Sequence, residues 1–218
     1  MRTLRLPVLE GVRMGITTTT LRHALDRAAL AARAAETALN AADAKMGDGD
    51  TGLTVRRLFD ALAAGQPRSG EDLGDYFADL ARICAGATGS SLGTLVTVSM
   101  MALAKALPGQ VEMPWRDLSP RLADLRDRML ARGGASLGDK TVVDMIDAVA
   151  RACAGLDTPA ALTAAARSAA RESLDRMRDQ PNRIGRARMF ADRSVGLDDP
   201  GMLAFMALLD AVTEAVHA

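Results

Sequence analysis

Apolar residues recur every three or four positions along most of the chain, which is the period of amphipathic helices. Short segments rich in Gly, Asp, Ser and Pro interrupt this pattern. It predicts eight helices, over residues 21–44, 53–62, 72–84, 94–107, 120–131, 142–154, 159–177 and 202–216. The expected fold class is therefore all-α.

The ends of several predicted helices carry recognisable capping residues. Threonines 17 to 20 offer N-caps for the first helix, and Thr158 followed by Pro159 is typical of a helix start. Residues 180–201 are rich in Gly, Arg and Asp without helical period, so we expect them to be irregular. The connections are short, which favours one domain over residues 1–218, with residues 1–16 as an N-terminal extension.

Composition supports this picture and excludes some partners. Hydrophobic residues make up 49% of the chain but aromatic residues only 3%, so the core must be built from Ala, Leu, Val and Met. The 27 basic residues equal the 27 acidic residues in number, which gives no reason to expect nucleic acid or an anionic membrane as partner. No segment is typical of a signal peptide or a membrane span, so a cytoplasmic protein is expected. Cys84 and Cys153 lie in apolar helical patterns, which indicates buried free thiols.

Three carboxylates lie within eight residues after the first predicted helix. Asp43, Asp48 and Asp50 repel one another, and Gly47 and Gly49 let the backbone turn so that the side chains meet. Asp43 also stands near a helix C-terminus, where an acid opposes the helix dipole. A bound cation offsets this crowding, and carboxylates with open coordination positions suit Mg²⁺ bridging to phosphates. A solvated Asp-Gly turn is the alternative.

Three further loops have a composition suited to phosphate binding. Residues 86–93 contain three glycines and two serines before an apolar helix, and a helix N-terminus binds phosphate well. Residues 132–141 are again glycine-rich and contain Asp139 and Lys140, which either orient neighbouring ligands or form an exposed ion pair. Residues 185–201 contain Arg186 and Arg193, whose guanidinium groups match phosphate oxygens. Plain caps and surface turns are the alternatives for each loop taken alone.

Taken together, the acidic, glycine-rich and basic loops predict a nucleotide-phosphate and metal site at one end of a helical bundle. The two histidines of the chain, His23 and His217, are far apart in sequence and outside these loops. No Ser-His-Asp or Cys-His set is evident, so a hydrolase with a side-chain nucleophile is disfavoured.

These loops resemble those of the nucleotide-binding L subunit of dihydroxyacetone kinase, the DhaL-type domain. The resemblance rests on four segments that occur in the same order: Asp43 to Gly52, Gly86 to Thr94, Arg132 to Thr141, and Gly185 to Gly201. They extend over most of the chain. The resemblance implies an antiparallel barrel of eight helices with the nucleotide at one end.

The resemblance also implies a set of site residues. Asp43, Asp48 and Asp50 would hold two Mg²⁺ ions that bridge the phosphates of ATP or ADP, and Arg186 would stabilise charge on the transferred phosphoryl group as the catalytic residue. The residues implied to contact the nucleotide are Thr51, Gly52, Leu53, Thr54, Ala87, Thr88, Gly133, Val142, Arg186, Asp199, Pro200 and Gly201.

By this resemblance the chain is half of an enzyme. A separate K-type subunit would hold the acceptor, a short ketose such as dihydroxyacetone or erythrulose. The donor would be exchangeable ATP, or a retained ADP rephosphorylated by a phosphotransferase-system protein. The family usually has His at the position of Thr51, Lys at that of Gly134 and Glu at that of Asp192.

Two alternatives of other classes stay open on the sequence. One is a non-catalytic module that senses ADP or ATP. The other is a helical bundle stabilised by Ca²⁺ without any nucleotide, although the spacing of the aspartates does not follow the EF-hand loop.

Overall fold

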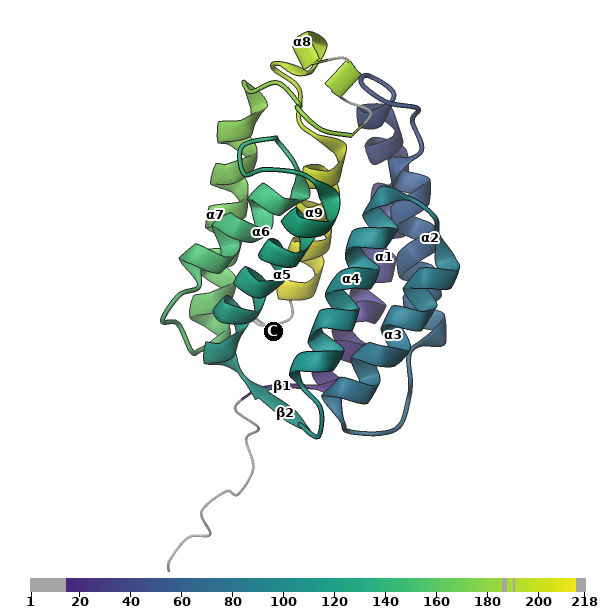
Figure 1. The fold of residues 1–218 in the computed structure, drawn as a ribbon, viewed down its shortest axis with the longest axis vertical. Coiled ribbons are helices and arrows are strands. Elements are labelled where there is room, and N and C mark those ends of the chain that lie inside the picture. The colour runs from purple at the N-terminus through teal and green to yellow at the C-terminus, as the bar shows by residue number, and fades with distance from the viewer. Residues whose placement is uncertain (1–14, 186–187, 190, 215–218) are drawn as a thin grey trace, which may run out of the picture.

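The computed structural model describes residues 15–185, 188–189 and 191–214, and within them the chain is largely helical (Figure 1). Eight helices of 11 to 26 residues account for most of this part. They are α1 (Thr18–Asp43), α2 (Thr51–Gly65), α3 (Leu73–Ala87), α4 (Ser91–Ala106), α5 (Leu118–Gly133), α6 (Val142–Ala152), α7 (Pro159–Arg178) and α9 (Pro200–Thr213).

The eight helices form a closed ring of antiparallel neighbours. Each helix packs against the next one along the chain, with α7 against α9, and α9 closes the ring by packing against α1. The all-α prediction of an eight-helix antiparallel barrel is therefore confirmed. Of the described residues, no helix is both long and apolar enough to cross a lipid bilayer.

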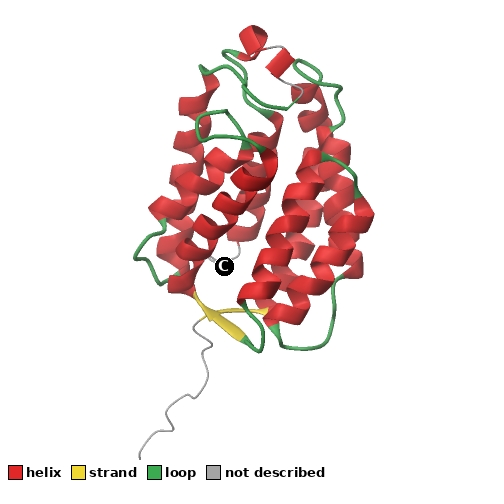
Figure 2. Ribbon diagram, in the orientation of Figure 1, coloured by secondary structure: helices red, strands yellow, loops and turns green. Residues whose placement is uncertain are grey.

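Four of the described elements were not predicted from the sequence. Two short strands, β1 (Gly15–Thr17) and β2 (Glu112–Pro114), form an antiparallel pair, with η1 (Trp115–Asp117) following β2 (Figure 2). The segment expected to be irregular contains a one-turn helix, α8 (Ala191–Ser194). Of the expected N-terminal extension, Gly15 and Ile16 belong to β1, and residues 1–14 lie outside the described part.

The helix boundaries also correct the prediction at three loops. Helix α2 begins at Thr51 rather than after Gly52, α3 continues through Gly86 to Ala87, and α5 continues to Gly133. The loop between α3 and α4 is thus only three residues long, because Ser90 caps α4 by accepting a hydrogen bond from the N–H of Gly93 at 3.0 Å. Glycine near a helix end does not by itself terminate the helix.

The apolar core has two principal clusters. One joins α2, α3, α4 and the strand pair around Leu58, Leu73 and Cys84, and the other joins α6, α7 and α9 around Met145, Cys153 and Met202. Trp115 and Leu118 pack against both clusters. Cys84 and Cys153 are buried free thiols in different clusters, as predicted.

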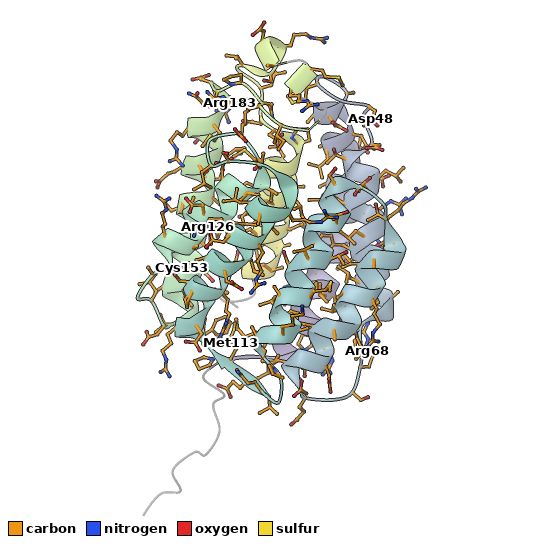
Figure 3. All side chains as sticks on the ribbon, in the orientation of Figure 1. Asp48, Arg68, Met113, Arg126, Cys153 and Arg183 are labelled. Atoms are coloured by element: carbon orange, nitrogen blue, oxygen red, sulfur yellow. The ribbon has the colours of Figure 1, made fainter. Side chains whose placement is uncertain are left out.

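An up-and-down ring places alternate connections at the same end. The loops after α1, α3, α5 and α7 therefore share one end, and the strand pair lies at the other (Figure 1). Figure 3 shows Asp48 and Arg183 at the loop end and Met113 and Arg68 at the opposite end. The four loops singled out in the sequence are brought together by topology alone.

The contact between α1 and α2 is unusually close at Gly52. A Cβ at this position would lie 2.1 Å from the carbonyl oxygen of Glu36 and 2.8 Å from Oδ1 of Asn40. Only glycine lets the first turn of α2 approach the backbone of α1 this closely. This approach places the N-terminus of α2 beside the acidic loop.

We expect Gly52→Ala to destabilise the chain by roughly 1–3 kcal/mol, because the added methyl group must push two helix backbones apart. Gly86→Ala is the matched control, since a Cβ at helical Gly86 would meet no atom within 4 Å. That change should be neutral or stabilising, by up to about 1 kcal/mol. Urea unfolding of both variants provides the comparison, and equal stabilities would contradict the close contact.

Candidate functional site

The three aspartates of the acidic loop converge at the loop end of the barrel. One carboxylate oxygen from each of Asp43, Asp48 and Asp50 lies within 4.8 Å of the other two. Asp43 is buried as the last residue of α1, whereas Asp48 and Asp50 are exposed. In the part of the chain that the structure describes, this is the one group of three or more acidic, His or Cys side chains so arranged.

Hydrogen bonds to α2 hold this loop in shape. Oδ2 of Asp43 accepts the backbone N–H groups of Asp50 at 2.9 Å and Thr51 at 3.1 Å. Oδ1 of Asn40 accepts the N–H of Leu53 at 3.1 Å. Asp43 and Asn40 thus cap α2 from α1, and the positive end of the α2 dipole offsets the negative charge that Asp43 adds at the end of α1.

The donor set suits a hard divalent cation. Carboxylate oxygens are the ligands that Mg²⁺ and Ca²⁺ prefer, and three of them crowded together are stabilised by such an ion. The backbone also leaves room for the carboxylates. A Cβ at Gly47 would lie 2.2 Å from Oδ1 of Asp43, and Gly49 adopts a φ of 77° that favours glycine.

The loop between α3 and α4 is open to solvent beside its helix cap. A Cβ at Gly89 would meet no atom within 4 Å, so the backbone there is accessible. Thr88 Oγ1 accepts the N–H of Ser90 at 3.1 Å, and Gly93 is packed so tightly that a Cβ would lie 2.2 Å from Thr88 Cγ2. Ala87 and Thr88, both predicted nucleotide contacts, are half-buried beside the N-terminus of α4.

Gly133 and Val142 flank the loop after α5. Val142 and Leu95 of α4 both pack against the buried cluster of Met129, Val143 and Ile146. A Cβ at Gly133 would make an ordinary contact of 3.6 Å with Leu95 Cδ2. These two predicted nucleotide contacts therefore both lie beside this apolar cluster, Val142 directly and Gly133 through Leu95.

Lys140 does not form the exposed ion pair that was one alternative for this loop. Its side chain is fully buried, and Nζ donates to three backbone carbonyls: Arg178 at 3.0 Å, Gln180 at 2.8 Å and Ser194 at 2.8 Å. Asp139 instead accepts the N–H of Ser136 at 2.7 Å within its own loop. Lys140 also adopts a φ of 63°, which is unfavourable for a residue with a side chain.

The segment after α7 leads to the N-terminus of α9. Asp199 caps α9, accepting the N–H of Met202 at 3.0 Å and Nδ2 of Asn182 at 2.8 Å. Withdrawal of this carboxyl from water raises the pKa of Asp199 to about 6. The side chain of Asp199 is thus engaged in positioning Pro200 and Gly201, which follow it as the first residues of α9.

The two arginines predicted to meet phosphate differ in what the structure describes. Arg193 of α8 is exposed, and its Nη2 donates to the carbonyl oxygen of Lys45 in the acidic loop at 3.5 Å. Arg186 lies outside the described residues, so its catalytic role stays a prediction.

Sequence reasoning missed Asn40, Asn182 and the burial of Lys140. Asn40 stands three residues before Asp43 and so on the same face of α1, a spacing that could have identified it. Asn182 is buried and joins Lys140 O at 3.1 Å to Asp199. Its partners come from distant parts of the chain, and no local signal indicates them.

Comparison with known proteins supports the grouping of these loops. The model of the DAK2 domain family matches residues 45–214. The ADP-binding subunit DhaL of the PEP-dependent dihydroxyacetone kinase of Escherichia coli is 28% identical over 180 residues, 78% of this chain and 84% of that protein. An L-erythrulose 1-kinase of Mycolicibacterium smegmatis is 45% identical over 94 residues, 40% of this chain but only 16% of that protein.

Solved structures show the same fold. The dihydroxyacetone kinase of C. freundii in complex with AMP-PNP and Mg²⁺ aligns with a TM-score of 0.70 and 23% identity. The alignment covers 99% of this chain and 38% of that chain, so this chain corresponds to a little over a third of the solved protein. Because the family model covers most of the sequence, the chain belongs to the DAK2 domain family, and its all-α barrel is a DhaL-type domain.

Proposed function

We propose that this chain is the nucleotide- and Mg²⁺-binding part of a short-ketose kinase, which transfers a phosphoryl group to a ketose held by a separate K-type subunit. The observation that carries the proposal is the convergence of the Asp43, Asp48 and Asp50 carboxylates beside the N-terminus of α2. The names of the relatives support the same reaction class, since they include kinases of dihydroxyacetone and of erythrulose.

In this proposal, each loop has a distinct task. Asp43, Asp48 and Asp50 would hold Mg²⁺, two ions by the resemblance, which lowers the charge on the nucleotide phosphates. Thr51, Gly52, Leu53 and Thr54 form the first turn of α2, whose N-terminus favours phosphate oxygens. Ala87 and Thr88 would meet the nucleotide from the loop before α4.

The remaining contacts are assigned to the other half of the barrel. Gly133 and Val142 would line the base pocket beside the apolar cluster of Met129, Val143 and Ile146. Asp199, Pro200 and Gly201 would close the site from the start of α9. Arg186 would stabilise charge on the phosphoryl group. The ketose, and any base that removes its proton, would come from the K-type subunit. The donor is ATP, or an ADP that a phosphotransferase-system protein rephosphorylates.

Asp48→Asn and Asp50→Asn should each weaken Mg²⁺-dependent ATP binding by about 2 kcal/mol or more, roughly thirtyfold, because each removes a charge from the cation site. Calorimetric titration with ATP, with and without Mg²⁺, measures this. Asp157→Asn is the matched control, since Asp157 is equally exposed but lies in the loop between α6 and α7, at the other end of the barrel. Wild-type affinity in either site variant would exclude the cation assignment.

The chain alone should form no ketose phosphate from Mg-ATP and dihydroxyacetone or erythrulose, since in this proposal the K-type subunit holds the ketose and supplies any base. Addition of a K-type subunit should start the transfer, which a coupled assay of ketose phosphate detects. Nucleotide binding without transfer in the presence of every K-type partner would favour the sensing module instead.

Asp199 gives this end of the barrel a pH dependence. Folding raises its pKa from about 3.8 to about 6, so the folded chain favours the protonated carboxyl. The stabilisation from this group is complete below about pH 4 and is lost as the pH rises through 6. Wild type should therefore lose roughly 2–3 kcal/mol of stability relative to Asp199→Asn between pH 4 and pH 7.5. Urea unfolding of both proteins across this range tests the expectation, and a constant difference would refute it.

A further inference from the structure

Lys140 is a buried basic residue in a chain whose basic residues are mostly arginines. Only three of its 27 basic residues are lysines, and the other two, Lys45 and Lys105, are exposed. An ammonium group is compact and has three donors, whereas a guanidinium is a planar fork with five. Three carbonyl oxygens lie at 2.8 to 3.0 Å from Nζ, one acceptor for each of the three N–H groups of the ammonium.

The three carbonyls come from both ends of one segment. Arg178 and Gln180 stand where α7 ends, and Ser194 ends α8, so the ammonium draws together residues 178–180 and 194. The carbonyls at the C-terminus of α7 carry partial negative charge, which suits a cation. Gly196 N–H donates to Arg178 O at 2.9 Å and closes the same loop on itself.

The backbone carbonyl of Lys140 also binds this segment, at Asn182. Asn182 Nδ2 donates both to Lys140 O at 3.1 Å and to Asp199 Oδ2 at 2.8 Å. The N–H of Asn182 donates to Ser194 Oγ at 2.8 Å. A continuous set of hydrogen bonds therefore runs from the loop before α6, through the buried Asn182, to the cap of α9.

We propose that Lys140 is a positioning residue. Its hydrogen bonds hold residues near both ends of the segment between Arg178 and Asp199 against the loop before α6. They thereby fix Pro200 and Gly201 opposite Gly133 and Val142. This inference rests on the proposed function, because those four residues are two walls of the proposed nucleotide site. The positive φ of Lys140 is consistent with this role, because the strained backbone is retained where its carbonyl and its side chain are both bound. Burial lowers the pKa of Lys140, while the carboxylates of Asp199 and Asp198 act to keep it charged.

The principal test is Lys140→Met, which keeps the length of the side chain and removes the ammonium. Mg-ADP affinity should fall at least tenfold by calorimetry, and hydrogen exchange in peptides from 179–199 should quicken at least tenfold in the nucleotide-free chain. Binding of Mn²⁺ alone should stay within twofold of wild type, because the carboxylate cluster belongs to a different loop. Lys105→Met, at an exposed position of α4, is the matched control and should leave all three measurements unchanged.

A second pair of measurements separates charge from packing. In Lys140→Ala, propylammonium should restore part of the Mg-ADP affinity and neutral propanol should not, a difference that a purely space-filling side chain would not produce. In the wild type, acetylation mapped by mass spectrometry should modify Lys45 and Lys105 and spare Lys140. Acetylation of Lys140 in the folded chain as fast as of Lys105 would overturn the buried arrangement.

The outcomes distinguish this inference from the function on which it rests. A folded Lys140→Met chain with wild-type Mg-ADP affinity or wild-type exchange in 179–199 overturns the positioning role and leaves the proposed function intact. If the Lys140 variants do not fold, Asn182→Ala decides, because it cuts the link between Lys140 and Asp199: a threefold or greater loss of Mg-ADP affinity supports the role, and wild-type affinity overturns it. A wild-type chain that binds neither Mn²⁺ nor Mg-ADP overturns the proposed function itself.

Discussion

Closure of the helical ring by α9 against α1 is the constraint on which the rest of this structure depends. Small side chains make it possible: Ala32 and Ala204 are buried in one cluster between these helices, and Arg27 binds the carbonyls of Ala211 and Val212 at 3.1 Å each. Because neighbouring helices in the closed ring are antiparallel, alternate loops lie at the same end of the barrel (Figure 1). The order of the helices therefore brings four loops from separate parts of the sequence to one end, where hydrogen bonds such as that from Arg193 to Lys45 O then join them.

The loop end concentrates charge, and backbone dipoles compensate for it. The acidic loop sets three carboxylates against the N-terminus of α2, with Asp43 accepting two of its N–H groups. On the other half of the ring, one buried ammonium faces three carbonyls near the C-terminus of α7. Each arrangement matches a charge to the helix end of opposite sign, which stabilises both loops.

Rigidity at this end is what the proposed chemistry needs. Phosphoryl transfer depends mainly on positioning and on electrostatic stabilisation, so fixed loops at one rim serve it better than mobile ones. In the proposed function, the barrel would supply a nucleotide and metal platform, and another subunit would hold the acceptor. This division agrees with the chain covering 84% of a subunit named as ADP-binding but only about a third of full-length ketose kinases.

The sequence by itself determined the eight helices, the N-caps of α1 and α7, the all-α class and the acidic loop, because helical period and capping depend on residues close together in the chain. It did not reveal the β1–β2 pair, in which Gly15 pairs with Pro114, or the close approach of Gly52 to Glu36. Only the tertiary structure decided that Lys140 is buried, because its partners are backbone carbonyls 38 to 54 residues away. A carbonyl oxygen is present at every residue, so nothing in the sequence distinguishes the three that bind this lysine.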